Sequence, residues 1–179
     1  MKLRNRWRRL PDGLLPVALR AWLREPDSLT ARCLCHCRIF HVRVLAQGRQ
    51  PALDEAFGRI CLPMREVLLE CDGVPVIFAH SVLSAPRSGQ LGSWFAGLGN
   101  RSLGSLLFRY PGFVREEIEY LRLDARHPLY RRVCAAVGAA PCFWARRSRH
   151  HLGAGSVLVT EVFLPALSAL TVVAGKRQP

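Results

Sequence analysis

Residues 143–165 read FWARRSRHHLGAGSVLVTEVFLP, the pattern of two β-strands joined by a glycine turn. The first strand is rich in arginine, whereas the second is mostly apolar and β-branched and carries one carboxylate, Glu161. Side chains alternate along a strand, so Val159 and Phe163 share the face of Glu161. Burying a lone acid on such a face is costly unless a cation, a hydrogen-bond donor or a ligand hydroxyl meets it. The partner of Glu161 is therefore the main unknown of both fold and function.

A second hairpin is predicted around Asp72-Gly73, because Asp-Gly between the strand-like runs 64–71 and 74–83 is among the strongest hairpin signals. Further strand patterns cover residues 33–46 and 117–123, and helix patterns cover residues 14–24, parts of 84–108, and 129–137. These elements give about six strands joined by hairpins or short helices, without regular βαβ alternation. The pattern predicts an α+β fold in one domain, with an antiparallel sheet and flanking helices.

The length of 179 residues suits one domain with one hydrophobic core. We expect a basic N-terminal extension at residues 1–13, the folded domain at residues 14–170 and a tail at residues 171–179. No stretch is long and apolar enough for a membrane-spanning helix, so stable membrane insertion is not expected. The basic N-terminus lacks the long apolar segment of a secretory signal, which favours a cytoplasmic location.

The net charge of +13 suits three kinds of partner: nucleic acid, anionic lipid headgroups and small anionic ligands. The arginines are spread along the chain, which favours a solvated basic surface with a few arginines selected for function. The aromatic content of 8% shows no interleaved stacking pattern, so no nucleic-acid partner is expected.

The chain has seven cysteines, and an odd number in a cytoplasmic protein predicts free thiols instead of a disulfide framework. Cys33, Cys35 and Cys37 alternate with other residues, which would place them on one face of a strand. Zinc sites usually separate paired cysteines by two or more residues. We therefore expect packed thiols in preference to metal or redox chemistry.

Arg65 is the candidate cation at the opposite end from Glu161, because it opens an apolar strand run. Arginine can bind a carboxylate through two parallel hydrogen bonds. Arg65 and Glu161 at opposite ends of an apolar pocket would suit a ligand with a carboxylate at one end and a hydroxyl at the other. The alternative is that the two form a structural ion pair. His80 is either a titrating group near the site or a hydrogen-bonded histidine of the sheet.

Five segments, in order and spacing, resemble the chorismate pyruvate-lyase (4-hydroxybenzoate synthase) family, and the resemblance covers roughly residues 20–167. They are Arg65-Glu66-Val67-Leu68-Leu69 with Asp72-Gly73; Phe78-Ala79-His80-Ser81-Val82; Leu98-Gly99 with Leu103-Gly104 and Leu107-Phe108; Trp144-Ala145-Arg146-Arg147-Ser148; and Thr160-Glu161-Val162-Phe163-Leu164-Pro165. Enzymes of this family convert chorismate to 4-hydroxybenzoate and pyruvate, the first committed step of ubiquinone synthesis.

The resemblance implies an α+β domain with a buried ligand pocket under helical flaps and with no metal or organic cofactor. It implies that Arg65 grips the product carboxylate and that Glu161 holds the 4-hydroxyl, so these two are the expected catalytic residues. Backbone groups of Leu29 and Leu103 would complete the substrate site. The family has methionine at position 29 and proline at position 102, where this chain has leucine and Ser102. Backbone contacts should survive both changes.

His80 and Arg147 are further candidates, as grips on the enolpyruvyl carboxylate of chorismate. We expect a monomer that binds this small-molecule substrate. The alternative function is a non-catalytic sensor domain that binds a small aromatic carboxylate, because the family's fold resembles effector-binding domains of some bacterial transcription regulators.

Overall fold

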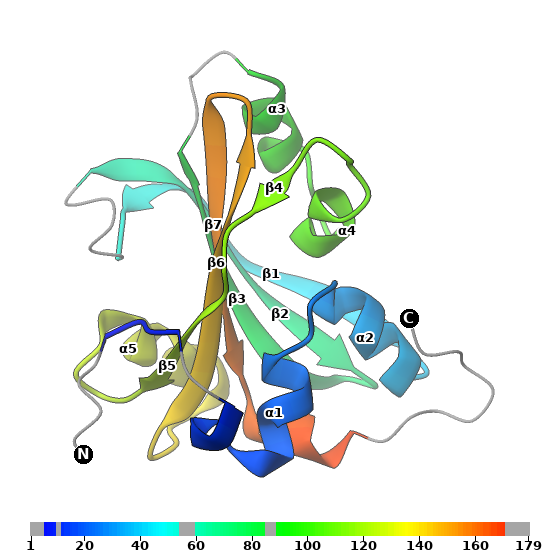
Figure 1. Ribbon diagram of the computed structural model, residues 1–179, viewed down its shortest axis with the longest axis vertical. Helices are drawn as coiled ribbons and strands as arrows, with labels where there is room; N and C mark the ends of the chain where they lie inside the picture. Colours follow the sequence, from blue (N-terminus) through cyan, green and yellow to red (C-terminus); the bar gives the residue numbers. More distant parts are fainter. Residues whose placement is uncertain (1–5, 10–11, 54–59, 85–88, 171–179) are drawn as a thin grey trace.

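The computed structural model describes residues 6–9, 12–53, 60–84 and 89–170. Over these ranges the chain forms seven β-strands, five α-helices and two short 3₁₀ helices (Figure 1). The helices are η1 (Asp12–Leu14), α1 (Val17–Leu23), α2 (Leu29–His36), α3 (Gln90–Ala96), α4 (Leu103–Leu107), α5 (Pro128–Val137) and η3 (Pro165–Ala169). The strands are β1 (Phe40–Pro51), β2 (Cys61–Cys71), β3 (Val74–Ser84), β4 (Val114–Arg115), β5 (Glu119–Leu123), β6 (Phe143–Leu152) and β7 (Gly155–Phe163).

All seven strands lie in one sheet, in the order β1-β2-β3-β7-β6-β4, and β5 also pairs with β6. Every pairing is antiparallel. The predicted α+β class with an antiparallel sheet is therefore confirmed. The strand beyond the expected six is β4, which has only two residues and so leaves no periodic pattern in the sequence.

Both predicted hairpins form, and each turn uses a left-handed residue. Asp72 has φ 51° and Gly73 has φ 81°, as a two-residue type I′ hairpin turn requires. The carboxylate of Asp72 also accepts hydrogen bonds from the backbone N–H of Arg38 at 3.0 Å and of Ile39 at 2.8 Å. These bonds tie the start of β1 to the turn between β2 and β3. Gly153, with φ 56°, allows the turn between β6 and β7.

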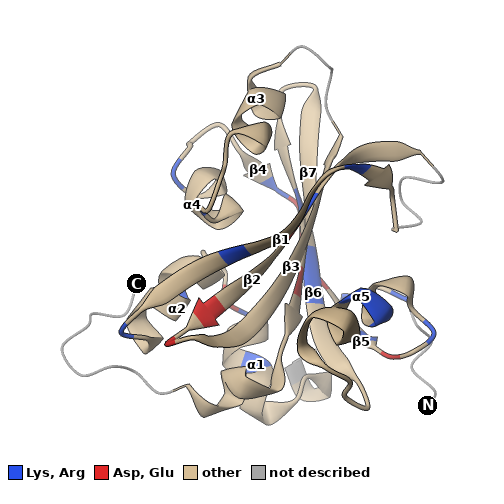
Figure 2. Ribbon diagram, turned by 180° about the vertical axis from the view of Figure 1, so that it is seen from behind, with Lys and Arg blue, Asp and Glu red and all other residues tan. Residues whose placement is uncertain are grey.

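Helices cover the two faces of the sheet unequally (Figures 1 and 2). On one face α5 packs through Leu129 and Val133 on a cluster that includes Val162 of β7. The other face carries α1 and α2 toward one end and α3 and α4 toward the other (Figure 1). There Leu103 of α4 packs in the same cluster as Val159 of β7. The alternation of β7 thus sends Val162 and Val159 to opposite faces, as predicted.

The predicted strand at residues 33–46 is correct over residues 40–46 but wrong over residues 33–39, because residues 29–36 form α2 and β1 begins only at Phe40. The hydroxyl of Ser28 caps this helix by accepting from the backbone N–H of Ala31 at 3.3 Å. Leu29 and Cys33, four residues apart, are both buried, which is the spacing of one helix face. The alternating cysteines had suggested a period of two, but the capping residue and tertiary packing decide for the helix.

The prediction of free thiols is wrong at one pair, because Cys37 and Cys71 form a disulfide with their Cα atoms 5.2 Å apart. Cys37 follows α2, and Cys71 ends β2 just before the Asp72-Gly73 turn. Their separation of 34 residues left no local signal of the pairing. Cys33 does behave as a packed thiol, since burial, followed by the charge of Glu161, raises its pKa to about 12.

Among the residues that the structure describes, lysine and arginine positions are spread over several elements (Figure 2). Part of the predicted basic extension lies on the domain, because the backbone of Arg8 exchanges two hydrogen bonds with Tyr120 of β5 at 3.0 and 2.7 Å. The predicted tail at residues 171–179 falls outside the described residues. Within the described ranges, no helix has the length and apolar character needed to cross a bilayer.

Candidate functional site

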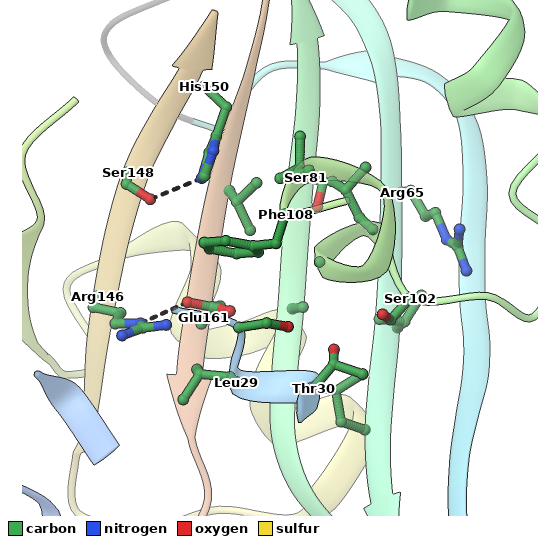
Figure 3. A pocket seen from close by; sticks show the side chains of 18 of the residues that line it. Leu29, Thr30, Arg65, Ser81, Ser102, Phe108, Arg146, Ser148, His150 and Glu161 are labelled. Atoms are coloured by element: carbon green, nitrogen blue, oxygen red, sulfur yellow. Dashed lines mark hydrogen bonds and ion pairs between the residues drawn. The ribbon is translucent and has the colours of Figure 1, made fainter. Parts of the chain in front are cut away.

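A cavity lies between the sheet and the two helices α2 and α4 (Figure 3). The space inside it that is open to the centre of a water molecule is about 40 Å³. Nine of its nineteen lining residues are apolar or glycine, and the other ten are three arginines, one glutamate, one histidine and five hydroxyl residues. Polar groups that converge within an apolar wall are typical of a ligand site.

Strand alternation assembles the polar lining from residues far apart in the sequence. Arg65 of β2 lies directly across from Ser81 of β3, and Arg146 of β6 lies directly across from Glu161 of β7. Ser148 follows Arg146 by two residues and so shares its face. All five side chains line the cavity.

Glu161 is paired with Arg146, not with Arg65. Arg146 donates from Nε to one carboxylate oxygen of Glu161 at 2.6 Å and from Nη1 to the backbone oxygens of Glu25 at 2.6 Å and Leu23 at 3.3 Å. Only 1% of Arg146 is exposed. The ion-pair alternative for Glu161 is thus correct in kind but not in partner. The second carboxylate oxygen points away from Arg146 toward the cavity interior (Figure 3).

Arg65 lies across the cavity from Glu161, as predicted (Figure 3). It is 2% exposed and donates from Nη2 to the backbone oxygens of Gly99 at 2.7 Å and Arg101 at 3.1 Å. Its Nε and Nη1 atoms are buried, and in the described part of the chain neither finds a hydrogen-bond partner. Burial also lowers the pKa of Arg65. Buried donors without partners are rare and costly, so this guanidinium is prepared for an anion.

The charges of the lining sum to +2, because Arg65, Arg115 and Arg146 contribute three positive charges and Glu161 one negative charge. No cluster of three or more His, Cys, Asp or Glu side chains that could hold a metal ion occurs among the described residues. The donor set is suited to an anionic ligand, with a dianion matching it best.

His150 closes one side of the cavity in a chain of hydrogen bonds. Arg115 donates from Nε to the hydroxyl of Ser148 at 3.0 Å, and Ser148 lies 3.2 Å from Nε2 of His150. Burial, followed by the charges of Arg115, Arg146 and His151, lowers the pKa of His150 from 6.5 to about 4. At neutral pH His150 is therefore uncharged, and its Nε2 shares a hydrogen bond with the Ser148 hydroxyl.

The protein should lose stability as the pH falls from 6.5 toward 4, partly through His150. The unfolded chain binds a proton at this residue below pH 6.5, but the folded protein does so only near pH 4, so acid favours unfolding. The His150 contribution to this loss is about 3 kcal/mol at most. Thermal unfolding between pH 4 and 7 should therefore show a smaller acid-induced drop in Tm for His150→Gln than for the wild type. Arg122→Gln, at an exposed position away from His150, should leave the wild-type drop unchanged, and an equal drop in all three proteins would contradict the assignment.

The two helices over the cavity meet at Gly104. A β-carbon at this position would lie 3.1 Å from the hydroxyl oxygen of Ser28 and 3.3 Å from that of Thr30. Leu29 and Leu103, both predicted site residues, line the cavity from α2 and α4. Close approach of the helices at this point therefore depends on the absence of a side chain.

Ser102 fills a structural role where the family resemblance pointed to proline. Its hydroxyl accepts from the backbone N–H of Ser105 at 3.1 Å and so caps α4. The proline of the family would start the same helix through its fixed φ. Serine at this position is therefore compatible with a helix start, and the survival of the backbone contacts stays a prediction.

His80 is not part of the cavity, because it points to the face covered by α5. Its Nδ1 lies 3.0 Å from Glu66, whose carboxylate also accepts from Arg132 of α5 at 3.0 Å. Burial would raise the pKa of Glu66, but the hydrogen bonds and charges of His80 and Arg132 hold it below its usual value. The interpretation of His80 as a hydrogen-bonded sheet histidine agrees with this geometry.

Arg147 also lies outside the cavity, one residue out of phase with Arg146. It donates to Glu119 of β5 at 2.7 Å and packs with its guanidinium carbon 4.7 Å from the ring centre of Trp7. With its neighbours it lines a separate, more open depression. The structure therefore brings Leu29, Arg65, Leu103 and Glu161 together but not His80 or Arg147.

Four polar residues of the lining were not singled out as site residues from the sequence: Arg115, Arg146, Ser148 and His150. The register of the last hairpin follows from its turn, in which Leu152 pairs with Gly155, and counting back would have paired Arg146 with Glu161. The same count would have placed Ser148 and His150 on that face. Arg115 lies in the two-residue strand β4, which is too short for any sequence pattern to indicate its place.

Comparison with known proteins gives one family. The chain matches the family model described as "Chorismate lyase" over residues 1–172. It is 57% identical over 173 residues to a probable chorismate pyruvate-lyase of Dechloromonas aromatica (strain RCB), covering 93% of this chain and 98% of that protein. A probable chorismate pyruvate-lyase of Aromatoleum aromaticum is 44% identical over 177 residues, covering 91% of this chain and 93% of that protein. Among solved structures, the effector domain of PhnF from Mycobacterium smegmatis is 16% identical with a TM-score of 0.46, over 71% of this chain and 82% of that one.

Proposed function

The chain belongs to the chorismate lyase family, in agreement with its motifs, and on this basis we propose that it converts chorismate to 4-hydroxybenzoate and pyruvate. The proposal includes the expectation from the resemblance that this cytoplasmic reaction begins ubiquinone synthesis. We further propose that the reaction needs no metal or organic cofactor.

The observation that carries the proposal is the state of Arg65. Two of its buried nitrogen atoms lack partners among the described residues, and a carboxylate is the group that satisfies two guanidinium donors at once. Across the cavity, Glu161 keeps one oxygen directed inward (Figure 3). A ring that carries a carboxylate and a hydroxyl at opposite positions would meet both groups once the cavity has widened to admit it.

The reaction can be written from these contacts. Arg65 anchors the ring carboxylate, and Glu161 accepts the hydrogen bond of the 4-hydroxyl. The ether bond at ring carbon C3 breaks with its electron pair passing to the oxygen of the enolpyruvyl group. The proton at C4 is lost, the ring becomes aromatic, and the departing enolate takes up a proton to become pyruvate. Aromatisation provides the driving force, so the protein must chiefly hold the reactive conformer and stabilise the charge on the leaving group.

The cavity must widen when the substrate enters. Space of about 40 Å³ holds only a few water molecules, which is less than a six-membered ring with its substituents requires. The strands of the sheet pair along their length, whereas α2 and α4 meet at Gly104. Separation of these two helices is therefore the opening that disturbs the structure least.

Turnover of chorismate by the purified protein tests the proposal. The wild type should produce equal amounts of 4-hydroxybenzoate, followed by its near-ultraviolet absorbance, and pyruvate, followed by a coupled assay. Arg122 is exposed and lies outside the cavity. The control Arg122→Gln removes one positive charge from the protein and should retain activity. If the wild type bound 4-hydroxybenzoate tightly and left chorismate untouched, the lyase function would be wrong and a sensor would be favoured.

A further inference from the structure

Chorismate carries two carboxylates, and in the proposed function only the ring carboxylate has a partner, Arg65. The following inference rests on that function. His80 and Arg147 were the sequence candidates for the second carboxylate, on the enolpyruvyl group, but both lie outside the cavity. The lining offers two other cations, Arg115 and Arg146.

Arg146 already donates hydrogen bonds to other groups of the protein. Its Nε donates to Glu161, and its Nη1 donates to two backbone oxygens of the segment between α1 and α2. With 1% of its surface exposed, it has little room to turn toward a ligand. Its role is to position the carboxylate of Glu161.

Arg115 is held in place but keeps donors to spare. It donates from Nε to Ser148 at 3.0 Å and from Nη1 to the backbone oxygen of Pro26 at 2.5 Å. Over the ranges that the structure describes, these are its hydrogen bonds, so both N–H groups of Nη2 remain for a ligand. Phe108 of α4 packs against the guanidinium, with 5.6 Å between its ring centre and the guanidinium carbon. A carboxylate at Nη2 would form a charge-assisted hydrogen bond in partly dry surroundings, where such bonds are strong.

Charge balance also favours Arg115 as the partner of the second carboxylate. Burial, followed by the charge of Arg146, lowers the pKa of Arg115, so the two cations are close enough to repel each other. A carboxylate bound at Arg115 would offset this repulsion. The net charge of +2 in the lining would then be matched by the two carboxylates of the substrate.

Arg115 also stands at a boundary of the cavity. Together with Ser148 it lines both the cavity and the open depression of about 480 Å³ that includes Arg147 and Arg149. The sheet edge is interrupted at this place, because β4 pairs with residues 150–151 of β6 and β5 pairs with residues 143–147. A carboxylate held by Arg115 would therefore lie at the outer side of the cavity.

We propose that Arg115 binds the enolpyruvyl carboxylate of chorismate and holds the departing pyruvate on the side of the cavity that borders this depression. Arg115 would stabilise the negative charge of the leaving fragment, whereas Arg65 binds the fragment that stays.

The test compares a ligand that has the second carboxylate with one that lacks it. For Arg115→Gln we expect kcat/KM for chorismate to fall roughly 30- to 100-fold, the effect of losing one charged hydrogen bond. The Kd of 4-hydroxybenzoate, measured by titration calorimetry, should change by less than about threefold, because this ligand has no enolpyruvyl group. Arg115→Lys keeps the charge and should recover part of the lost kcat/KM. Pyruvate should inhibit the wild type competitively and the Arg115→Lys protein more weakly.

Each outcome decides the matter. Arg122→Gln removes an exposed charge and should leave all three measurements at wild-type values. An equal loss in kcat/KM and in 4-hydroxybenzoate affinity for both Arg115 variants would show a structural role and overturn the inference while leaving the proposed function intact. An unchanged kcat/KM in Arg115→Gln would also overturn it. If Arg115→Gln failed to fold, the pyruvate inhibition of Arg115→Lys would decide, and inhibition as strong as in the wild type would contradict the proposal. A wild type without turnover would overturn the proposed function and this inference together.

Discussion

Replacement of Arg65 by Ala should reduce kcat/KM for chorismate by about 10³-fold, since two charge-assisted hydrogen bonds to a carboxylate contribute roughly 4 kcal/mol together. The affinity for 4-hydroxybenzoate should fall by a similar factor, because the product keeps the ring carboxylate. The loss follows from the two buried nitrogen atoms of Arg65 for which the described part of the chain offers no partner. Steady-state kinetics and titration calorimetry measure the two effects.

A ligand without the carboxylate separates recognition from folding. Phenol, which keeps only the ring and its hydroxyl, should bind the wild type and Arg65→Ala with equal, weak affinity. The double comparison of protein and ligand then isolates the carboxylate contact. Arg65→Lys provides the matched control, because it keeps the charge but not the paired donors, and it should fall between the two proteins. A loss of phenol binding as large as the loss of 4-hydroxybenzoate binding would argue that Arg65 merely supports the loop at Gly99 and Arg101.

Replacement of Arg146 by Met should lower the free energy of unfolding by roughly 3 to 5 kcal/mol, because it leaves Glu161 in a mostly buried place without its cation. It also removes the donor to the backbone oxygens of Leu23 and Glu25. For a protein of this size we expect Tm to fall by about 10 °C. Thermal unfolding followed by circular dichroism measures the shift.

The cause can be tested by removing the acid as well. In the double variant Arg146→Met/Glu161→Leu no buried charge is left unpaired, so a large part of the lost stability should return while activity stays absent. A double variant no more stable than Arg146→Met would assign the loss to the backbone contacts and not to the ion pair. Arg122→Met, at an exposed position, controls for the loss of charge alone and should leave Tm within about 2 °C of the wild type.

The sheet was predictable to a large extent because its signals are local. Asp72-Gly73 and the glycine turn of residues 143–165 each define a hairpin by turn chemistry and alternation. The predictions of strands and helices fail where the deciding contact comes from a part of the sequence that is far away. Residues 33–36 alternate like a strand, yet the Ser28 cap and the packing of Cys33 make them helical. The disulfide between Cys37 and Cys71 joins segments that have no sequence pattern in common.

The site was predictable where a single residue conflicts with its surroundings. Glu161 and Arg65 are charged residues within apolar strands, and both line the cavity. The sequence could not identify which arginine meets Glu161, because Arg146 and Arg147 are chemically the same and differ only in the face on which they lie. Nor could it find Arg115, whose place depends on how β4 and β5 divide the edge of β6.

The meeting of α2 and α4 at Gly104 has a consequence for the exchange of ligand with solvent. At Gly104 the contact between these two helices brings a glycine against the hydroxyls of Ser28 and Thr30, groups that water can solvate when the helices part. Opening at this contact therefore exposes little apolar surface there and needs no unfolding of the sheet. Helices α2 and α4 can therefore close tightly around a ligand and still release it. The same small groups that permit their close contact also keep the free energy of separating them low.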